Sequence, residues 1–235
     1  MINDMDTDSS GDQFADIARA LSNEPGVTAT LDTATATALT IVGGCDHAGI
    51  SLVTKGQKIV TVAPTDDTIV RGDLMQYETK QGPCLQAIAD HETVHAPDLL
   101  EDQRWPLWSP RVAKELGVRS VLALQLFVGP SSIGCLNLYS QTPHAYAPSD
   151  RVSAMALAAH IAVAMTAAQG KEDLESALMT RTVIGQAEGM LMQALKITAP
   201  QAFAALTRVS QARNIKLHLV AKDIVDNGIR AELFA

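Results

Sequence analysis

Hydrophobic residues change their spacing along this chain, and that change constrains the fold more than any other feature. Up to Val42 they recur every three or four residues, which predicts helices near 14–21 and 27–42. From Asp46 to Tyr139, alternating runs typical of strands appear between helical segments. The expected strands are 48–53, 58–63, 93–95, 119–128 and 132–139. Turns are expected at Lys55-Gly56-Gln57 and Gly129-Pro130. Helices are expected at 67–79 and 105–116, and a further helix is expected to begin near residue 83. The last two strands are apolar on both faces, which predicts an α+β fold whose sheet is covered on each side.

Helical spacing resumes at Pro148 and continues toward the C-terminus. Ser149-Asp150 starts a helix that runs to Gly170, which we expect to be a flexible joint because glycine costs about 1 kcal/mol inside a helix. Three helices should follow, an all-α bundle. The first helix is expected at 173–194, and the second should begin at a capping box formed by Thr198 and Gln201. The third should begin after Asn214 as its N-cap and end at Asn227-Gly228. The third has a helical stripe to bury: Leu217, Val220, Ala221, Ile224 and Val225.

The helix after Pro148 carries a second stripe. Val152, Met155, Ala159 and Ala162 are spaced by three, four and three residues, as in a coiled-coil seam. The stripe either packs on the sheet of its own chain or joins two copies of the chain. The second alternative predicts a homodimer held by a connecting helix at 149–180.

Composition limits the class of protein. The chain is 47% hydrophobic, which is enough for a buried core. It has no uninterrupted apolar run of about 18 residues, so no membrane span is expected. Residues 1–12 are acidic and polar, so we expect a disordered N-terminus without a signal peptide. Cys45, Cys84 and Cys135 are widely spaced in apolar surroundings, which indicates reduced core thiols in a cytoplasmic protein.

Positive charge is concentrated near the C-terminus. Between 181 and 222 there are six basic residues and one acidic residue, Glu188, a net charge of +5 in a chain of formal net charge −8. The first 170 residues hold 10 basic and 19 acidic residues, a net charge of −9. A basic island on an acidic protein is a candidate surface for a polyanion, and RNA is the obvious large one.

The N-terminal segment resembles the GAF domains of actinobacterial regulators over about 14–168, and the domain is expected at 13–168. The resemblance rests on four stretches: Gly82-Pro-Cys-Leu85, Asp98-Leu-Leu-Glu-Asp-Gln-Arg-Trp-Pro106, Gly117-Val-Arg-Ser-Val-Leu122 and Ile133-Gly-Cys-Leu-Asn-Leu-Tyr-Ser140. It implies a six-stranded antiparallel sheet with flanking helices and a sensory role. Many such domains bind a small ligand, but no cofactor is identifiable here, because the sequence has no haem or chromophore attachment signature.

The C-terminal segment resembles an ANTAR domain, a three-helix module of antitermination regulators, over 171–228. The matching positions are Leu178, Arg181, Ile184-Gly-Gln-Ala187, Gly189-Met-Leu-Met192, Ala202-Phe203, Leu206, Ser210, Asn214, Lys216-Leu217 and Val220-Ala221. The resemblance implies recognition of paired RNA hairpins in a nascent leader transcript, which prevents a terminator from forming. This chain departs from the family at Glu188, where a lysine is usual, and an acid there repels phosphate.

A surface that binds RNA hairpins needs cations for phosphates and side chains that pair with base edges. The candidate RNA-binding residues are Arg181, Gln186, Gly189, Arg208, Arg213, Asn214, Lys216 and Lys222. Gly185 and Gly189 allow either close approach of RNA or close packing of helices. Free backbone N–H groups at the start of the third helix also favour phosphate.

Two patterns point to enzymes instead. His91-Glu-Thr-Val-His95 matches the zinc-peptidase pattern H-E-x-x-H, with Glu115 as a possible third ligand, but β-branched residues predict a strand here. In a strand the two histidines lie about 13 Å apart, too far to share one zinc. Cys84 at a helix start is either a reactive thiol or a small apolar residue. We therefore expect no enzyme and no metal site.

The sequence predicts a cytoplasmic transcription regulator in which a GAF domain senses a signal and an ANTAR bundle binds RNA and promotes readthrough. A long helix would join the two domains and transmit the signal. The alternative is a signal-sensing oligomerisation protein whose C-terminal bundle docks on a protein partner. RNA binding would weaken steeply with salt, whereas apolar docking would tolerate it.

Overall fold

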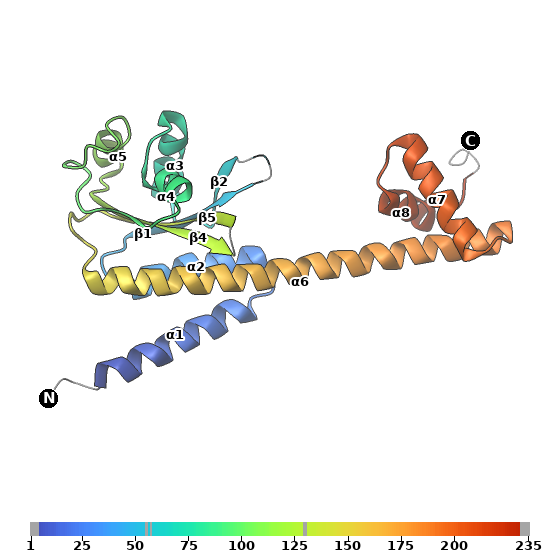
Figure 1. The fold of residues 1–235 in the computed structure, drawn as a ribbon, viewed down its shortest axis with the longest axis horizontal. Coiled ribbons are helices and arrows are strands. Elements are labelled where there is room, and N and C mark those ends of the chain that lie inside the picture. Colours follow the sequence, from blue (N-terminus) through green and yellow to red (C-terminus); the bar gives the residue numbers. More distant parts are fainter. Residues whose placement is uncertain (1–4, 55, 57, 129–130, 231–235) are drawn as a thin grey trace. The chain divides into compact units, whose positions relative to one another are not determined.

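The chain folds into two compact units, Met1–Gln169 and Gly170–Ala235 (Figure 1). The structure, a computed structural model, describes residues 5–54, 56, 58–128 and 131–230. The predicted turns at Lys55-Gly56-Gln57 and Gly129-Pro130 fall wholly or partly outside these residues, as do residues 1–4. Each unit has its own hydrophobic core and is described separately.

The N-terminal unit is built on a five-stranded antiparallel sheet with strand order β2-β1-β5-β4-β3. The strands are β1 (His47–Val53), β2 (Ile59–Val62), β3 (Val94–Ala96), β4 (Ser120–Val128) and β5 (Ser131–Ser140). The five strands predicted from alternation are thus confirmed. The sixth strand that the family resemblance implies does not occur among the described residues, because no further alternating segment is present.

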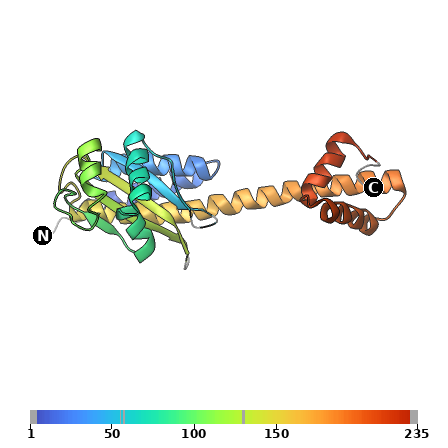
Figure 2. The ribbon, with the colours of Figure 1, turned by 90° about the horizontal axis from the view of Figure 1, so that it is seen from above.

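Helices cover both faces of this sheet, as predicted (Figures 1 and 2). One face packs against α2 (Val27–Ile41) and the first part of α6 (Pro148–Leu195), while α1 (Met5–Asn23) lies outside this layer and packs on these two helices. The other face packs against α3 (Asp67–Thr79), α4 (Pro83–Asp90) and α5 (Ser109–Leu116). Side chains alternate along β4, so Leu122 and Leu124 enter the first core while Val121 and Ala123 enter the second.

The N-terminal helix begins earlier than the sequence predicts. The structure places 5–12 in α1, although these residues were expected to be disordered. The apolar positions Ile17 and Leu21 anchor the helix in the core, and Phe14 stacks on His160 with ring centroids 6.0 Å apart. Once this segment is helical, each added residue costs little, because the unfavourable nucleation step is already complete.

A buried polar network holds α3 against the sheet. The Asp73 carboxylate is fully buried and accepts hydrogen bonds from five side chains. The donors are Ser51, Thr61, Gln76, Asn137 and Tyr139, at 2.9–3.2 Å. Burial raises the pKa of Asp73, and these hydrogen bonds oppose that shift. Nearby, the Trp108 indole donates to the Gly72 carbonyl at 2.9 Å, where a glycine lets the helix approach the sheet closely.

The C-terminal unit contains the end of α6, α7 (Ala199–Arg213) and α8 (Leu217–Asn227) around one small core. Thr198 and Gln201 form the predicted capping box, in which the Gln201 side-chain oxygen accepts from the Thr198 backbone N–H at 2.9 Å. The predicted stripe of α8 is confirmed, with Val220, Ala221 and Ile224 buried. The core residues are Ala187, Leu191, Ala202, Leu206, Val209, Val220, Ala221 and Ile224.

Two boundary predictions in this region are wrong. The helix is not broken at Gly170, because α6, which is 48 residues long, runs through this position without interruption. A single glycine is tolerated at a cost of about 1 kcal/mol. Asn214 is not the N-cap of α8. It ends α7 in the left-handed conformation (φ 51°), and Lys216 precedes α8. Asparagine is among the few residues that adopt this conformation readily, which suits it to a helix C-terminus.

Candidate nucleic-acid interface

The small core of the C-terminal unit orients its basic side chains outward. Leu191, Leu206 and Val220 occupy the interior, so residues on the opposite faces of the three helices are exposed. All eight candidate RNA-binding residues are exposed: Arg181, Gln186 and Gly189 on α6, Arg208 and Arg213 on α7, Asn214 and Lys216 between helices, and Lys222 on α8. The structure does not gather them into one cluster.

Arg181 lies in a groove between α6 and α7 that we call the α6–α7 groove. Its lining includes Arg181, Gly185 and Glu188 of α6 and Phe203 of α7, and its volume is about 690 Å³. Asp173 is at the same groove. Phe203 is 46% exposed, whereas Glu188 is half-buried and forms no ion pair with another described residue. The groove therefore combines a cation, carboxylates and an exposed ring, and is not lined by cations alone.

Gln186 and Gly189 line a different groove. It has a volume of about 650 Å³ and also involves Met190, Gln193 and Ile229. Positions 181 and 186 are five residues apart on α6, which turns their side chains by roughly 140°. Arg181 and Gln186 therefore do not face the same ligand surface.

The two helical glycines of this segment are open on the outside. A Cβ added at Gly185 or Gly189 would meet no heavy atom within 4 Å. Of the two alternatives left open by the sequence, close packing of helices is not seen at Gly185 or Gly189 within this unit, because nothing packs on either residue. Each glycine costs helix stability without a compensating contact inside the domain.

Carboxylates that follow the basic island neutralise part of it. Lys222 forms an ion pair with Asp226 at 3.1 Å, and Asp223 forms an ion pair with Arg230. The pKa of Asp223 is lowered by hydrogen bonds from Asn227 and Arg230 and by the charge of Arg213. A charge count that ends at residue 222 misses these acids, although one extended to the end of the helix would have found them.

The apolar stripe of α6 in the N-terminal unit is largely exposed. Val152 and Met155 are 66% and 55% exposed, and Val163 is 70% exposed. The sheet is covered by other positions of the helix, among them Leu157 and Ile161, and Ala162 alone of the predicted seam is buried. A groove of about 770 Å³ runs beside the stripe, lined by Met155, Ala159, Val163 and Leu124 among others. Packing on its own sheet therefore does not account for this stripe.

The zinc-peptidase pattern does not form a site. His91 ends α4 in the left-handed conformation, and His95 lies in β3, as the predicted strand required. Glu115 on α5 is paired with Arg111 at 3.1 Å. Cys84 is fully buried, and its backbone N–H donates to the Gln76 side chain, so its thiol is not open to a substrate.

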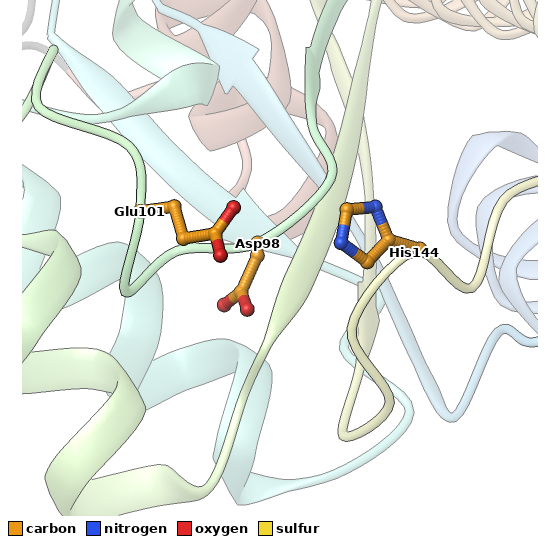
Figure 3. Close-up of side chains that lie close together, drawn as sticks. All are labelled: Asp98, Glu101 and His144. Atoms are coloured by element: carbon orange, nitrogen blue, oxygen red, sulfur yellow. The ribbon is translucent and has the colours of Figure 1, made fainter.

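Asp98, Glu101 and His144 lie close together after β3 and β5, with potential ligand atoms within 4.8 Å of one another (Figure 3). Arg119 already binds both carboxylate oxygens of Asp98, at 2.6 and 3.1 Å. These hydrogen bonds are the main reason that the pKa of Asp98 is lowered. A guanidinium on this carboxylate opposes a metal cation, so the cluster stabilises the loop instead.

The sequence model of the GAF domain family matches residues 24–166, more than half of the chain. The chain belongs to the GAF family. The model of the ANTAR domain matches residues 172–225, which cover most of the three-helix unit. The chain thus combines a GAF sensory domain with an ANTAR domain, a module of RNA-binding antiterminators. No curated protein matches the chain.

Solved structures of several other proteins share the fold of the N-terminal unit. The GAF domain of an Acinetobacter phosphoenolpyruvate-protein phosphotransferase is 14% identical with a TM-score of 0.55, covering 72% of this chain and 97% of that one. Free methionine-R-sulfoxide reductase from Neisseria meningitidis is 19% identical with a TM-score of 0.53, covering 67% and 89%. The cyanobacteriochrome TePixJ GAF domain is 15% identical with a TM-score of 0.51, covering 62% and 92%. At these identities the likeness shows the fold alone.

Among the described residues, α6 is long and apolar enough to cross a membrane by length and composition. Of its most apolar window, 39% is buried inside the protein. Leu157, Ile161 and Met165 of this helix belong to the GAF core. The apolar character of α6 therefore comes partly from residues of the GAF core and partly from its exposed stripe, and one such helix does not by itself indicate a membrane protein.

Proposed function

We propose that this protein is an RNA-binding regulator that prevents transcription termination by binding paired hairpins in nascent leader RNA, under control of its GAF domain. The observation that carries the proposal is the ANTAR match at 172–225 on a bundle with exposed cations. The first 170 residues have a net charge of −9, which disfavours RNA on the GAF domain. Its action would take place in the cytoplasm, where nascent transcripts are made.

The exposed side chains of the ANTAR domain suit a hairpin loop. Arg181, Arg208 and Lys216 are exposed cations for phosphates, and Gln186 can pair with a base edge. Gly185 and Gly189 leave the surface of α6 open to close approach of a backbone. Lys216 precedes α8, whose first N–H groups have no side-chain cap and favour phosphate.

We further propose that two copies of the chain associate through the exposed stripe of α6. Val152, Met155 and Val163 form an apolar surface beside a groove of about 770 Å³, which water solvates poorly. Two copies carry two ANTAR domains, which matches a leader with two hairpins. The GAF signal would reach the bundle by shifting the population of α6 geometries.

Mobility shift with a double-hairpin leader tests the RNA claim, at two salt concentrations. Affinity should fall steeply with salt. A plot of the logarithm of the binding constant against the logarithm of the salt concentration should have a slope of roughly −0.7 to −0.9 for each phosphate that the protein neutralises. A transcription assay on the same leader should show more readthrough with the protein than without it. Salt-tolerant capture of a protein, with no RNA binding, would favour the rival function of a docking module.

Sedimentation tests self-association. Met155→Glu places a carboxylate in the apolar stripe and should convert a dimer to a monomer, because burying an unpaired charge is costly. Gln103→Glu adds the same charge at an exposed position outside α6 and outside the groove, and should leave the dimer intact. A monomeric unchanged protein at micromolar concentration would refute the dimer.

The coupling through α6 has its own test. Gly170→Pro removes a helix hydrogen bond and should uncouple the domains, whereas Gly170→Ala should stiffen the helix. Readthrough measured with both variants compares the two effects. If neither variant changes RNA affinity or readthrough, α6 does not transmit the signal.

A further inference from the structure

The α6–α7 groove has a charge balance that differs from the basic faces around it. Arg181 is its one cation, while Asp173 and Glu188 are carboxylates. A phosphate inside this groove would face more negative than positive charge, so the RNA backbone is not its best occupant. A group that donates hydrogen bonds to carboxylates fits it better.

Glu188 is placed to accept such hydrogen bonds. It is half-buried, it lines the groove, and no described residue neutralises it through an ion pair. A carboxylate with little water around it forms strong charge-assisted hydrogen bonds with N–H donors. In an RNA loop, such donors are found on the base edges.

Phe203 supplies the second element of a base site. Its ring is 46% exposed at the groove, on the α7 side, where a planar ligand can reach it. Unstacked bases in RNA loops bind by stacking on aromatic rings. Gly185 also lines the groove and adds no side chain that would obstruct a planar base.

We propose that the α6–α7 groove receives one unpaired base of the RNA loop, and that Glu188 selects guanine. The base would stack on Phe203, the Glu188 carboxylate would accept from guanine N1–H and N2–H, and Arg181 would bind the adjacent phosphate. Uracil is disfavoured, because its single N3–H is flanked by two carbonyl oxygens that repel a carboxylate. The inference rests on the proposed RNA-binding function and adds a specificity determinant to it.

The site changes the meaning of Glu188. At a phosphate contact an acid in place of a lysine only weakens binding. In this groove the same acid lowers the affinity for RNA in general but increases the discrimination between bases. An unpaired carboxylate disfavours every base that places a hydrogen-bond acceptor against it. Glu188→Lys should then bind RNA more tightly and less selectively than the unchanged protein.

Selection from a pool of double stem-loops with randomised loops tests the proposal on the full-length protein. The unchanged protein should enrich guanine at one loop position, and replacing that guanine by inosine, which lacks the N2 amine, should weaken binding roughly tenfold. Glu188→Gln should bind the guanine and inosine loops about equally. Phe203→Leu should lower affinity for all loops while keeping the order of preference.

Glu175→Gln is the matched control. It removes a carboxylate from the same helix at an exposed position outside the groove, and it should leave the guanine preference unchanged. Circular dichroism of each variant confirms that the bundle is folded. If Glu188→Gln selects the same loops as the unchanged protein, the base site is refuted while RNA binding stands. If the unchanged protein binds no loop in the pool, the proposed function and this inference are both refuted.

Discussion

The GAF and ANTAR domains place their polar groups in opposite ways. The polar residues that the structure describes as fully buried lie in the GAF domain, where Asp73, Asn137 and Ser51 bond to one another inside the core. The core cluster of the ANTAR domain is built from apolar residues, and most of its described polar side chains are exposed, although the Thr207 hydroxyl is buried. The first domain uses polarity to define its own structure, and the second presents polarity to a ligand.

This contrast has an energetic basis. A buried hydrogen-bonded network is costly to disturb, because each buried polar group left without a partner lowers the free energy of unfolding by about 1–3 kcal/mol. It therefore specifies one packing of α3 on the sheet. A small apolar core of eight residues allows many surface substitutions, so residues such as Glu188 can vary without loss of fold.

The largest effect is expected at Asp73. Asp73→Leu removes the acceptor of four buried donors and of the half-buried Thr61, and should lower the free energy of unfolding of the GAF domain on the order of 4 kcal/mol. Asp90→Leu, at an exposed position, is the control and should change stability little. Chemical denaturation measures both. Equal stability of the two variants would show that the network does not hold the domain together.

A somewhat smaller loss is expected at Leu191 in the ANTAR core. Leu191→Ala creates a cavity and should cost about 3 kcal/mol, enough to unfold the bundle while the GAF domain stays folded. Hydrogen exchange should then show lost protection in α7 and α8 but not in β4 and β5. Leu195→Ala, at a side chain 51% exposed, should have little effect. Loss of protection throughout the chain would mean that the domains do not unfold separately.

Gly185→Ala should separate stability from function. Alanine fits the open space at this position and should stabilise the bundle by about 0.5–1 kcal/mol. The added methyl group projects at the α6–α7 groove and should weaken RNA binding. Thermal unfolding and mobility shift measure the two effects on one variant. A stabilised protein with unchanged RNA affinity would remove Gly185 from the interface.

The smallest effect concerns pH and the Asp98–Arg119 pair of the GAF domain. Because the pKa of Asp98 is lowered in the folded state, its stabilisation is present above the ordinary value of 3.8 and is lost as pH falls through the lowered pKa. Denaturation at pH 6 and at pH 3 should show this loss. In Asp98→Asn the difference between the two pH values should shrink. An identical pH profile for both proteins would argue against the pair.

The sequence by itself determined the elements whose signals are local. Alternation located all five described strands, the Thr198–Gln201 box located the start of α7, and the apolar stripe of α8 identified its buried side. These patterns follow from the periods of strands and helices, which neighbours along the chain impose. The division into GAF and ANTAR domains followed from short motifs in the same way.

Only the tertiary structure decided how the helices and their side chains meet. It carried α6 through Gly170, turned Arg181 and Gln186 to different grooves, and paired Lys222 with Asp226. It also placed Glu188 and Phe203, residues of different helices that no spacing connects, at one groove. A groove is formed by the packing of two helices on a shared core, so its lining cannot be read from the periodicity of either one.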